Sequence, residues 1–417
     1  MKFIDLFSGI GGFRSGLEKN GHKAIAYSEV DKYAKQSYTS IYETSEELDL
    51  GDITKVSNEQ WQDLKGKANI IVGGSPCQSF SLAGKRRGFE DTRGTLFFHY
   101  VNAVKEVQPE FFIFENVKGM ISHDKGETIK TVLSSFNEIG YDIDFDVFNS
   151  KYYGVPQNRE RIYIVGKRKD LGINESRESV KGKKKLDQLK NWAIENINYV
   201  KLLPENNNEN VEKRLVDVLE DKVDEKYYLS EEKTKKLTLN LDLEGLSPAL
   251  NCMRGGGLEP KIAVREATKQ GYSIAEQGDS VNVSYPTSTT RRGRVGKQVA
   301  QTLQAGEVNQ GVVINPLKDK TEYGWHFEQA VYDSQGITRT VKANGGSGNI
   351  PKTIEGLRIR KLTPLECWRL QGFTDEQFYK AKDSGVSNSQ LYKQAGNAVT
   401  VNVVDAITKE LFKHGLK

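Results

Sequence analysis

The chain is poor in cysteine, and its few cysteines are widely spaced. Cys77, Cys252 and Cys367 are the only three in 417 residues. So few and so scattered thiols do not form the disulfide framework of a small secreted protein, and we expect a reducing compartment. The five histidines show no metal-ligand spacing with these cysteines, so we predict no metal site.

Long hydrophobic runs are also missing. No apolar stretch approaches the length of a membrane-spanning helix, and Met1-Lys2 leads straight into a short strand-like run without a signal peptide. We therefore expect a cytoplasmic protein with no membrane partner. Hydrophobic residues still make up 37% of the chain, which is enough to build cores for two domains.

A strong net charge is the third absence. The formal charge of +4 does not by itself indicate a nucleic-acid-binding protein. Local clusters of basic residues are more informative about nucleic-acid binding. Basic residues gather at Lys85-Arg86-Arg87, at Arg291-Arg292-Gly293-Arg294 with Lys297, and at Arg358, Arg360 and Lys361. Clusters of this kind can supply phosphate contacts.

What the chain does have is a regular alternation of short apolar runs and helical patterns over its first 170 residues. The expected strands are residues 2–7, 24–28, 69–72, 111–115, 141–149 and 161–166. The expected helices are residues 12–20, 32–42, 95–107 and 127–138. Such alternation predicts an α/β fold with a doubly wound, mostly parallel sheet.

A glycine-rich turn follows the first expected strand. Glycines at Gly9, Gly11 and Gly12 would let backbone amides approach a ligand at a helix N-terminus. Glu29, after the second strand, would accept hydrogen bonds from ribose hydroxyls, and Asp52 suits an adenine amino group. The turn is not G-x-G-x-x-G, so the pattern indicates a nucleoside site without the dinucleotide fingerprint.

One cysteine occupies a position that suits a nucleophile. The apolar run 69–72 ends in Gly73-Gly74-Ser75-Pro76-Cys77. In open α/β sheets ligands bind beyond the carboxyl ends of the strands, and the fixed φ of a proline would hold the next residue there. The alternative for Cys77 is a small buried hydrophobic residue.

Six blocks in fixed order resemble the DNA cytosine-5 methyltransferase family. They are DLFSGIGGFRSGLE, GGSPCQSFSLAGKRRGFEDTRGTLF, FFIFENVKGM, YYGVPQNRERIYIVG, RKLTPLECWRLQGF and YKQAGNAVTVNVV. The resemblance implies the fold of S-adenosylmethionine-dependent methyltransferases with a second, smaller β-rich target-recognition domain. It also implies methylation of carbon 5 of a flipped-out cytosine in double-stranded DNA, with S-adenosyl-L-methionine as cofactor.

The resemblance assigns the catalytic roles. Cys77 would add to carbon 6 of the cytosine, Glu115 would hold N3, and Asn116 would shape the same turn. Arg159 and Arg161 would contact the cytosine O2 and the active-site carboxylate, and their alternation predicts that both lie on one face of a strand.

The cofactor positions implied by the resemblance are Phe7, Ser8, Gly9, Gly11, Glu29, Val30, Asp52, Ile53, Pro76, Asn397 and Val399. Many members of the family have a tryptophan where this chain has Val30, so we expect less stacking on adenine. The terminal stretch 397–414 has helical periodicity and would complete the cofactor pocket.

DNA contacts are expected in two places. The loop 79–94 would close over the DNA and contribute Ser81, Lys85, Arg86, Arg87 and Arg93. The recognition region would contribute Arg254, Arg291, Arg292, Thr302, Arg339 and Thr340. Thr302-Leu303 and Thr340-Val341 are both candidates for the Thr-Leu-like pair of the family.

We therefore predict a catalytic domain of residues 1–175 with 392–417, and a target-recognition domain of residues 176–391 that begins with a charged linker at about 176–245. The source would be bacterial or phage, of the restriction–modification type. A cognate restriction endonuclease would act separately, and the enzyme would bind DNA as a monomer.

Two other functions were weighed. An RNA cytosine-5 methyltransferase is disfavoured because small RNA-directed relatives lack the long region between the QNRER and RKLTP blocks. A catalytically silent DNA-binding regulator is disfavoured because Cys77, Glu115 and Arg161 are all present.

Overall fold

The computed structural model describes residues 1–76, 96–172, 174–206, 213–237, 261–303, 310–314, 331–333, 352–354 and 358–413. The chain divides into two compact units. Residues 1–212 and 368–417 form the first unit, and residues 213–367 form the second. The first unit is therefore discontinuous in sequence.

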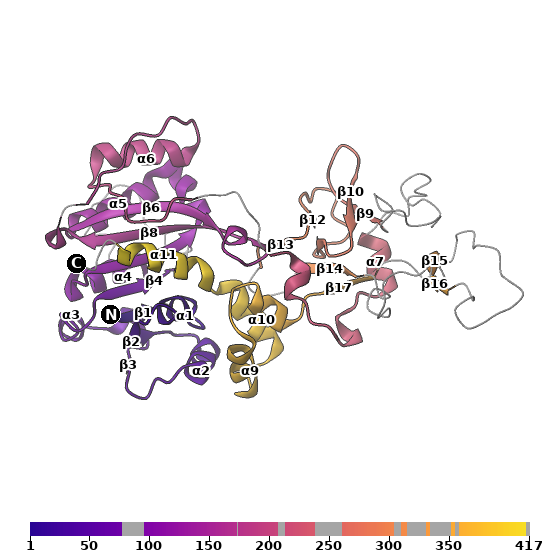
Figure 1. Cartoon of the computed structure of the whole chain (residues 1–417), viewed down its shortest axis with the longest axis horizontal. Helices are drawn as coiled ribbons and strands as arrows, with labels where there is room; N and C mark the ends of the chain where they lie inside the picture. The colour runs from indigo at the N-terminus through magenta and orange to yellow at the C-terminus, as the bar shows by residue number, and fades with distance from the viewer. Residues whose placement is uncertain are drawn as a thin grey trace, which may run out of the picture. The chain divides into compact units, whose positions relative to one another are not determined.

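A seven-stranded sheet organises the first unit, with strand order β3-β2-β1-β4-β5-β8-β6 (Figure 1). Its strands are β1 Lys2–Leu6, β2 Lys23–Ser28, β3 Leu48–Asp49, β4 Ile70–Gly73, β5 Phe111–Val117, β6 Tyr141–Asn149 and β8 Glu160–Arg168. Only β8 runs antiparallel to its neighbours β5 and β6. The sheet is thus mostly parallel, and its order reverses beside β1 as in doubly wound folds, which confirms the predicted fold class.

Helices cover both faces of this sheet because the central strands are apolar on both sides. The helices of the unit are α1 Gly12–Glu18, α2 Lys32–Ile41, α3 Asn58–Gln62, α4 Leu96–Val107, α5 Glu127–Glu138, α6 Lys185–Asn196, α9 Asp375–Asp383, α10 Asn388–Asn397 and α11 Val401–Lys413. All four residues of β4 are buried, as expected for a parallel strand enclosed by helices.

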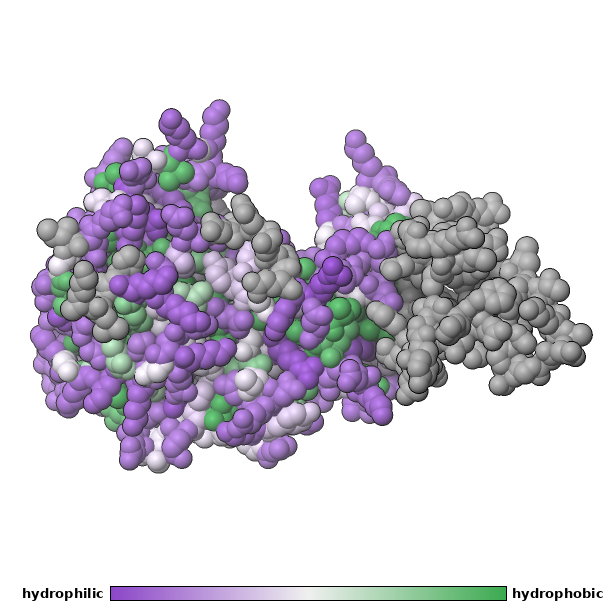
Figure 2. All heavy atoms as spheres, viewed as in Figure 1, coloured by the Kyte–Doolittle hydropathy of each residue, from purple (hydrophilic) through white to green (hydrophobic). Residues whose placement is uncertain are grey.

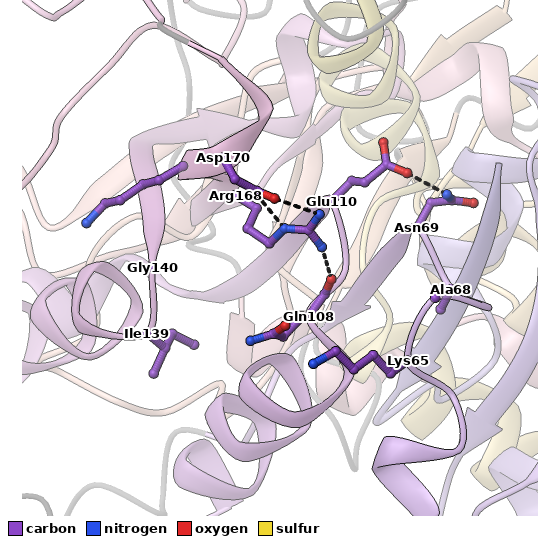
Figure 3. A pocket seen from close by; sticks show the side chains of 11 residues that line it. Lys65, Ala68, Asn69, Gln108, Glu110, Ile139, Gly140, Arg168 and Asp170 are labelled. Atoms are coloured by element: carbon purple, nitrogen blue, oxygen red, sulfur yellow. Dashed lines mark hydrogen bonds and ion pairs between the residues drawn. The ribbon is translucent and has the colours of Figure 1, made fainter.

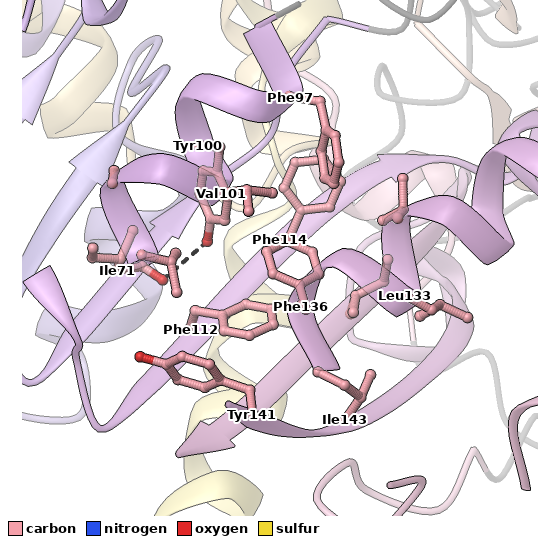
Figure 4. Close-up of a cluster of buried hydrophobic side chains, with 14 of the residues drawn as sticks. Ile71, Phe97, Tyr100, Val101, Phe112, Phe114, Leu133, Phe136, Tyr141 and Ile143 are labelled. Carbon is pink, nitrogen blue, oxygen red and sulfur yellow. Dashed lines mark hydrogen bonds between the residues drawn. The ribbon is translucent and has the colours of Figure 1, made fainter. Parts of the chain in front are cut away.

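Aromatic side chains fill the core on the face covered by α4 and α5 (Figure 4). Phe112 of β5 and Phe136 of α5 stack with ring centroids 4.2 Å apart. The hydroxyl of Tyr100 donates to the carbonyls of Ile71 and Ile113, at 3.2 and 3.0 Å, so its one polar atom is satisfied inside the core. Aromatic pairs with a satisfied hydroxyl stabilise such a core without a desolvation penalty.

Small residues let the first and last helices of the unit pack closely on the other face. A Cβ atom at Gly12 would lie 2.3 Å from the carbonyl oxygen of Val399, and one at Gly16 would lie 2.6 Å from Cγ1 of Val404. Only glycine fits at these two positions of α1, so the periodicity of residues 397–414 becomes a helix docked on α1.

The observed unit boundaries differ from the predicted domains. Residues 176–212 and 368–391, which we expected in the second domain, belong to the first unit. Leu189 and Ala193 of α6 enter the same core as α4 and α5. Trp368 packs against Phe378 and donates its indole N–H to the carbonyl of Leu391 at 3.0 Å. Both segments belong to the first unit because their apolar side chains pack there. A shift in composition along the chain does not indicate this packing.

The second unit is smaller and rich in strands, as predicted. A four-stranded sheet has the order β12-β11-β14-β17, and β9 pairs with β10 in a hairpin. The bounds in this unit are β9 Lys261–Arg265, β10 Tyr272–Glu276, β11 Ser280–Asn282, β12 Val295–Gly296, β13 Ala300–Gln301, β14 Gln310–Ile314, β15 Val331–Asp333, β16 Lys352–Ile354, β17 Arg358–Lys361 and α7 Glu231–Leu237. Its core is small, with Val264, Val281 and Ile359 among the buried residues.

A buried ion pair replaces one of the expected phosphate contacts. Arg360 is 2% exposed and donates two hydrogen bonds, of 2.8 and 2.7 Å, to the carboxylate of Glu366. Glu366 also accepts from the backbone amides of Thr363 and Glu220. The expectation that Arg360 binds phosphate is therefore wrong, because its guanidinium is enclosed and fully occupied.

Polar residues cover most of the visible face of the first unit, and hydrophobic residues are scattered singly on it (Figure 2). No helix in the described part of the chain combines the length and the apolarity needed to cross a bilayer.

Candidate active site

A cavity of about 690 Å³ lies in the first unit beyond the carboxyl ends of β1, β2, β4 and β5. Its lining includes the predicted residues Phe7, Gly9, Glu29, Val30, Asp52, Ile53, Pro76, Glu115, Asn116, Arg159, Arg161 and Asn397. Residues from seven separate sequence segments thus meet at the edge where open α/β sheets bind ligands.

The glycine turn is supported from both sides. Phe7 has a φ of 53° and Gly11, which precedes α1, has a φ of 82°. The ring of Tyr42 lies where a Cβ atom of Gly11 would be, and the Tyr42 hydroxyl donates to the Gly11 carbonyl at 2.9 Å. A non-glycine residue in the left-handed region is costly, so its presence at Phe7 is typical of a functional turn.

Glu29 holds the turn in place with its carboxylate. Its Oε2 accepts from the Gly9 amide at 2.8 Å, and its Oε1 accepts from the amides of Val30 and Asp31 at 2.9 and 2.8 Å. The glutamate therefore links the end of β2 to the turn after β1. Val30 is 71% exposed and lies at the rim of the cavity.

Two further carboxylates line this part of the cavity. Asp31 caps α2 by accepting from the amides of Tyr33 and Ala34, and Lys393 donates to it at 2.7 Å. Burial alone would raise the pKa of Asp31, but the Lys393 and amide hydrogen bonds outweigh it and the pKa is lowered. Asp52 accepts from the hydroxyl and amide of Thr54, which lower its pKa. These carboxylates make this side of the cavity negative.

Glu115 and Arg161 form an ion pair at the end of β5. The Arg161 Nε lies 3.2 Å from Glu115 Oε1. Burial raises the pKa of Glu115, and the positive charges of Arg161 and Arg159 only partly oppose this. A carboxyl with a raised pKa beside a fixed cation is a candidate for proton transfer to a bound molecule.

Asn116 joins this pair to the end of β4. Its Nδ2 donates to the carbonyl of Ser75 at 2.9 Å, and its Oδ1 accepts from the amide of Val117. The segment Ser75-Pro76 is thereby held next to Glu115, and Cys77 follows directly in the sequence.

Arg159 has a different environment from Arg161. It is 3% exposed and donates to the carbonyls of Gly396 and Ala398 at 3.1 and 2.8 Å. Burial and the neighbouring Arg161 lower the pKa of Arg159 to about 10. Its guanidinium therefore fastens the segment between α10 and α11 to the cavity, while Arg161 contacts the carboxylate.

Some predicted residues lie beside the cavity, and others fall outside the described part of the chain. Ser8 is buried, and Gly11 and Val399 pack behind the cavity lining, with the Val399 carbonyl against Gly12. Arg291, Arg292 and Thr302 lie in the second unit. Cys77, Ser81, Lys85, Arg86, Arg87, Arg93, Arg254, Arg339 and Thr340, and with them the expected loop 79–94, lie outside the described residues.

Sequence analysis missed several lining residues on α10. Gln390, Lys393, Gln394 and Gly396 all face the cavity. Their spacing of three to four residues places them on one face of a helix, and the block YKQAGNAV contains three of the four. That spacing, together with the resemblance of the block, was the available signal.

A second cavity, of about 550 Å³, lies at the opposite edge of the sheet (Figure 3). Its Arg168 pairs with Asp170, and Asn69 donates to Glu110 at 2.6 Å. It contains none of the predicted site residues. Within the described ranges no group of three or more histidine, cysteine or acidic residues could hold a metal ion.

The fold and the cavity define the class of protein: an α/β enzyme of the methyltransferase type, with a discontinuous catalytic unit and a second strand-rich unit. The chain belongs to the family of C-5 cytosine-specific DNA methylases, whose model matches residues 1–413. It is a DNA cytosine-5 methyltransferase.

Named relatives extend over nearly the whole chain. The orphan methyltransferase M.SPRI of Bacillus phage SPR is 40% identical, over 99% of this chain and 97% of its own length. The type II methyltransferase M.HpaII of Haemophilus parainfluenzae is 33% identical, over 99% of this chain and 89% of its own length. A crystal structure of a Spodoptera frugiperda DNMT2 mutant has a TM-score of 0.54 at 18% identity, covering 99% of both chains, and is similar in fold.

Proposed function

We propose that this enzyme methylates carbon 5 of a specific, flipped-out cytosine in double-stranded DNA, with S-adenosyl-L-methionine as methyl donor and a covalent adduct at Cys77. The observation that carries the proposal is the buried Glu115–Arg161 pair, which shares one cavity with Glu29, the glycine turn and Pro76. A cofactor site and a proton-transfer site then lie side by side, next to the residue that precedes the cysteine.

The residues of the cavity fit such a cofactor. The hydroxyl of Ser75 is buried, lines the cavity and has no hydrogen-bond partner within the described residues. Glu29, Asp31 and Asp52 provide the negative charge that suits a sulfonium and an ammonium group. When bound, the cofactor supplies an electrophilic methyl group. Glu29 would accept from the ribose hydroxyls and Asp52 from the adenine amino group.

The protein groups would then prepare the cytosine. Carbon 5 of cytosine is a poor nucleophile, and addition of the Cys77 thiolate at carbon 6 moves electron density toward it. Glu115 would give its proton to N3 as the thiolate adds, since its raised pKa keeps the carboxyl protonated to a higher pH than usual. After methylation, the carbon 5 proton would pass to solvent, the thiolate would leave and the N3 proton would return to Glu115, which restores the aromatic ring.

Arg161 would keep the Glu115 carboxyl aligned and contact the cytosine O2. A base inside a duplex cannot reach these groups, so the target must leave the stack. We expect the enzyme to act as a monomer on DNA. Some relatives are named orphan methyltransferases and others type II methyltransferases. We propose that a cognate restriction endonuclease acts separately as the restriction–modification partner.

Methyl transfer assays with duplex DNA and transfer RNA side by side test the substrate class. We expect incorporation into DNA alone, at one sequence that bisulfite sequencing of a methylated plasmid identifies. Incorporation into transfer RNA with none into DNA contradicts the proposal. Light scattering of the enzyme on its target duplex tests the monomer.

A further inference from the structure

An arm of the second unit is fixed at its base by a buried arginine. Residues 283–294 connect β11 to β12. Arg294 is fully buried and donates to the carbonyls of Asn282, Ser284 and Tyr285, at 3.0, 2.9 and 2.7 Å. This arginine was expected among the basic phosphate contacts, and that expectation is wrong. A buried guanidinium that bonds three carbonyls instead defines the path of the backbone.

The outgoing side of the arm is fixed as well. The Ala267 amide donates to the carbonyl of Arg291 at 2.8 Å, and Arg292 Nε donates to the carbonyl of Ala267 at 3.1 Å. The Gly293 amide donates to the carboxylate of Glu266. The turn of the β9–β10 hairpin thus holds residues 291–293, the part of the arm that leads back to β12.

Tyr285 protrudes from this fixed arm in a strained conformation. Its φ is 46°, and it is 74% exposed. A single exposed tyrosine is ordinary, but a non-glycine residue in the left-handed region persists only where the surroundings enforce it. Arg294 donates to the Tyr285 carbonyl and so holds the peptide group that follows this residue.

Arg291 lies against the ring of this tyrosine. Its guanidinium carbon is 5.7 Å from the ring centroid of Tyr285. Within the described residues the Arg291 side chain has no hydrogen-bond or ion-pair partner, whereas Arg292 is bonded to the hairpin. The Arg291 donors are therefore available, and the aromatic ring limits the orientations of the guanidinium plane.

Hydroxyl side chains of the arm and of the hairpin turn line a cavity beside the arm. A cavity of about 630 Å³ is lined by Thr268, Thr287, Ser288 and Thr289. Arg265 and Lys236 also line it, together with Glu232, which pairs with Lys236, and Glu266, which accepts from Gly293. Hydroxyls of this kind donate to DNA phosphates and fix a protein on the duplex without reading its sequence.

We propose that Arg291 and Tyr285 form a base-reading pair, in which Arg291 donates to a base edge of the target duplex and Tyr285 is the positioning residue that orients it. The inference rests on the proposed function. An arginine is the usual reader of guanine in the major groove, because its planar fork matches two acceptors on the base. A fixed arm with a pre-oriented fork suits that recognition better than a mobile chain does.

The test measures how strongly the wild type and each variant prefer the target duplex over a set of altered duplexes. One duplex carries the target found by bisulfite sequencing, and each of the others carries one changed base pair of it. Affinities from fluorescence anisotropy at three salt concentrations give a specificity ratio at every position. For Arg291→Ala we expect a loss of roughly 5- to 150-fold in the ratio at one base pair, with the other positions unchanged.

Tyr285 variants test the positioning role. Tyr285→Ala should reproduce much of that loss at the same base pair, and Tyr285→Phe should restore the wild-type ratio because the ring remains. Tyr379→Ala is the matched control, since Tyr379 is an exposed tyrosine beside a lysine on α9. Its specificity ratio should equal that of the wild type. Thermal unfolding by circular dichroism verifies that each variant is folded.

Two results would overturn the inference. Arg291→Ala could weaken all duplexes equally and reduce the slope of affinity against salt, which identifies a phosphate contact. Tyr285→Ala could leave every ratio unchanged, which removes the positioning role. Failure of the proposed function looks different, because the wild type would then methylate no DNA cytosine while its DNA affinity and that of the variants remain measurable.

Discussion

Nε of Arg161 lies 3.2 Å from Oε1 of Glu115, and the two side chains are only 17% and 12% exposed. The pair joins a strand end of the parallel part of the sheet to its one antiparallel strand. Burial favours the neutral carboxyl, and the arginine favours the charged one. The net effect is a raised pKa of Glu115.

Glu115→Gln should reduce the rate of methyl transfer by roughly 10²- to 10⁴-fold, because the amide has no proton to give to N3. Cofactor affinity measured by calorimetry should change little. The raised pKa of Glu115 means that the wild-type rate falls as pH rises through that value. The variant should lack this fall in single-turnover assays from pH 5 to 9, and an identical pH profile for both proteins would contradict the role.

Cys77→Ser should abolish methyl transfer and leave cofactor binding intact. A duplex with 5-fluorocytosine at the target should trap the wild type as a covalent complex on a denaturing gel, since fluorine replaces the carbon 5 proton that must leave. The serine variant should form no complex. Cys367→Ser is the control, because Cys367 is buried and should not affect the adduct. A trapped complex with Cys77→Ser would show that Cys77 is not the nucleophile.

Glu29→Ala should raise the dissociation constant of S-adenosylmethionine by roughly 5- to 150-fold. The change removes the acceptor of three backbone amides, those of Gly9, Val30 and Asp31, and an unpaired donor costs about 1–3 kcal/mol where it is shielded from water. Calorimetric titration measures the effect. Glu46→Ala is a suitable control, since the Glu46 side chain is 85% exposed. Equal cofactor affinities of the two variants would place the cofactor elsewhere.

Tyr42→Phe should weaken cofactor binding without contact between Tyr42 and the cavity. The Tyr42 hydroxyl donates to the Gly11 carbonyl and lies 2.5 Å from the Ser15 hydroxyl, to which Gln377 of α9 also donates. Its loss leaves buried groups unpaired, at a cost of about 1–3 kcal/mol in the free energy of unfolding. Urea denaturation and calorimetry measure the two effects. Tyr379→Phe should change neither quantity. An unchanged cofactor affinity in Tyr42→Phe would show that these hydrogen bonds do not affect the glycine turn.

Glu366→Gln should destabilise the second unit by about 3–5 kcal/mol, because it leaves Arg360 buried without its counter-charge. The double variant Arg360→Met with Glu366→Leu should recover part of this loss, since apolar residues of similar volume need no counter-charge, while the amides of Thr363 and Glu220 lose their acceptor. Urea denaturation of both variants measures the difference. Equal destabilisation by the single and double changes would show that packing, and not charge, dominates there.

Strong local patterns gave the best predictions. The strand at residues 141–149 and the helix at residues 127–138 appear with the predicted bounds. Both have clear apolar periodicity that the sheet and its covering helices then use. The glycine turn and Glu29 were predicted from the strands that precede them, whereas Glu115 was assigned by the family resemblance; the structure brings all three to one cavity.

Partners that lie outside the basic clusters account for the errors. Arg360 and Arg294 look like exposed cations in the sequence, yet a carboxylate six residues away encloses one and three carbonyls enclose the other. Nothing in a local cluster of basic residues indicates these partners.

The contact of α1 with the segment around Val399 has a consequence for biosynthesis. Gly12 and Gly16 pack against Val399 and Val404, which follow the whole second unit in the sequence. Translation of its roughly 150 residues takes on the order of 10–30 s at about 5–20 residues per second. During that time the nascent sheet presents an uncovered apolar face to chaperones, and the cavity lacks the wall that α10 provides. A chain that ends inside the second unit therefore lacks α9, α10 and α11, and with them one wall of the cavity.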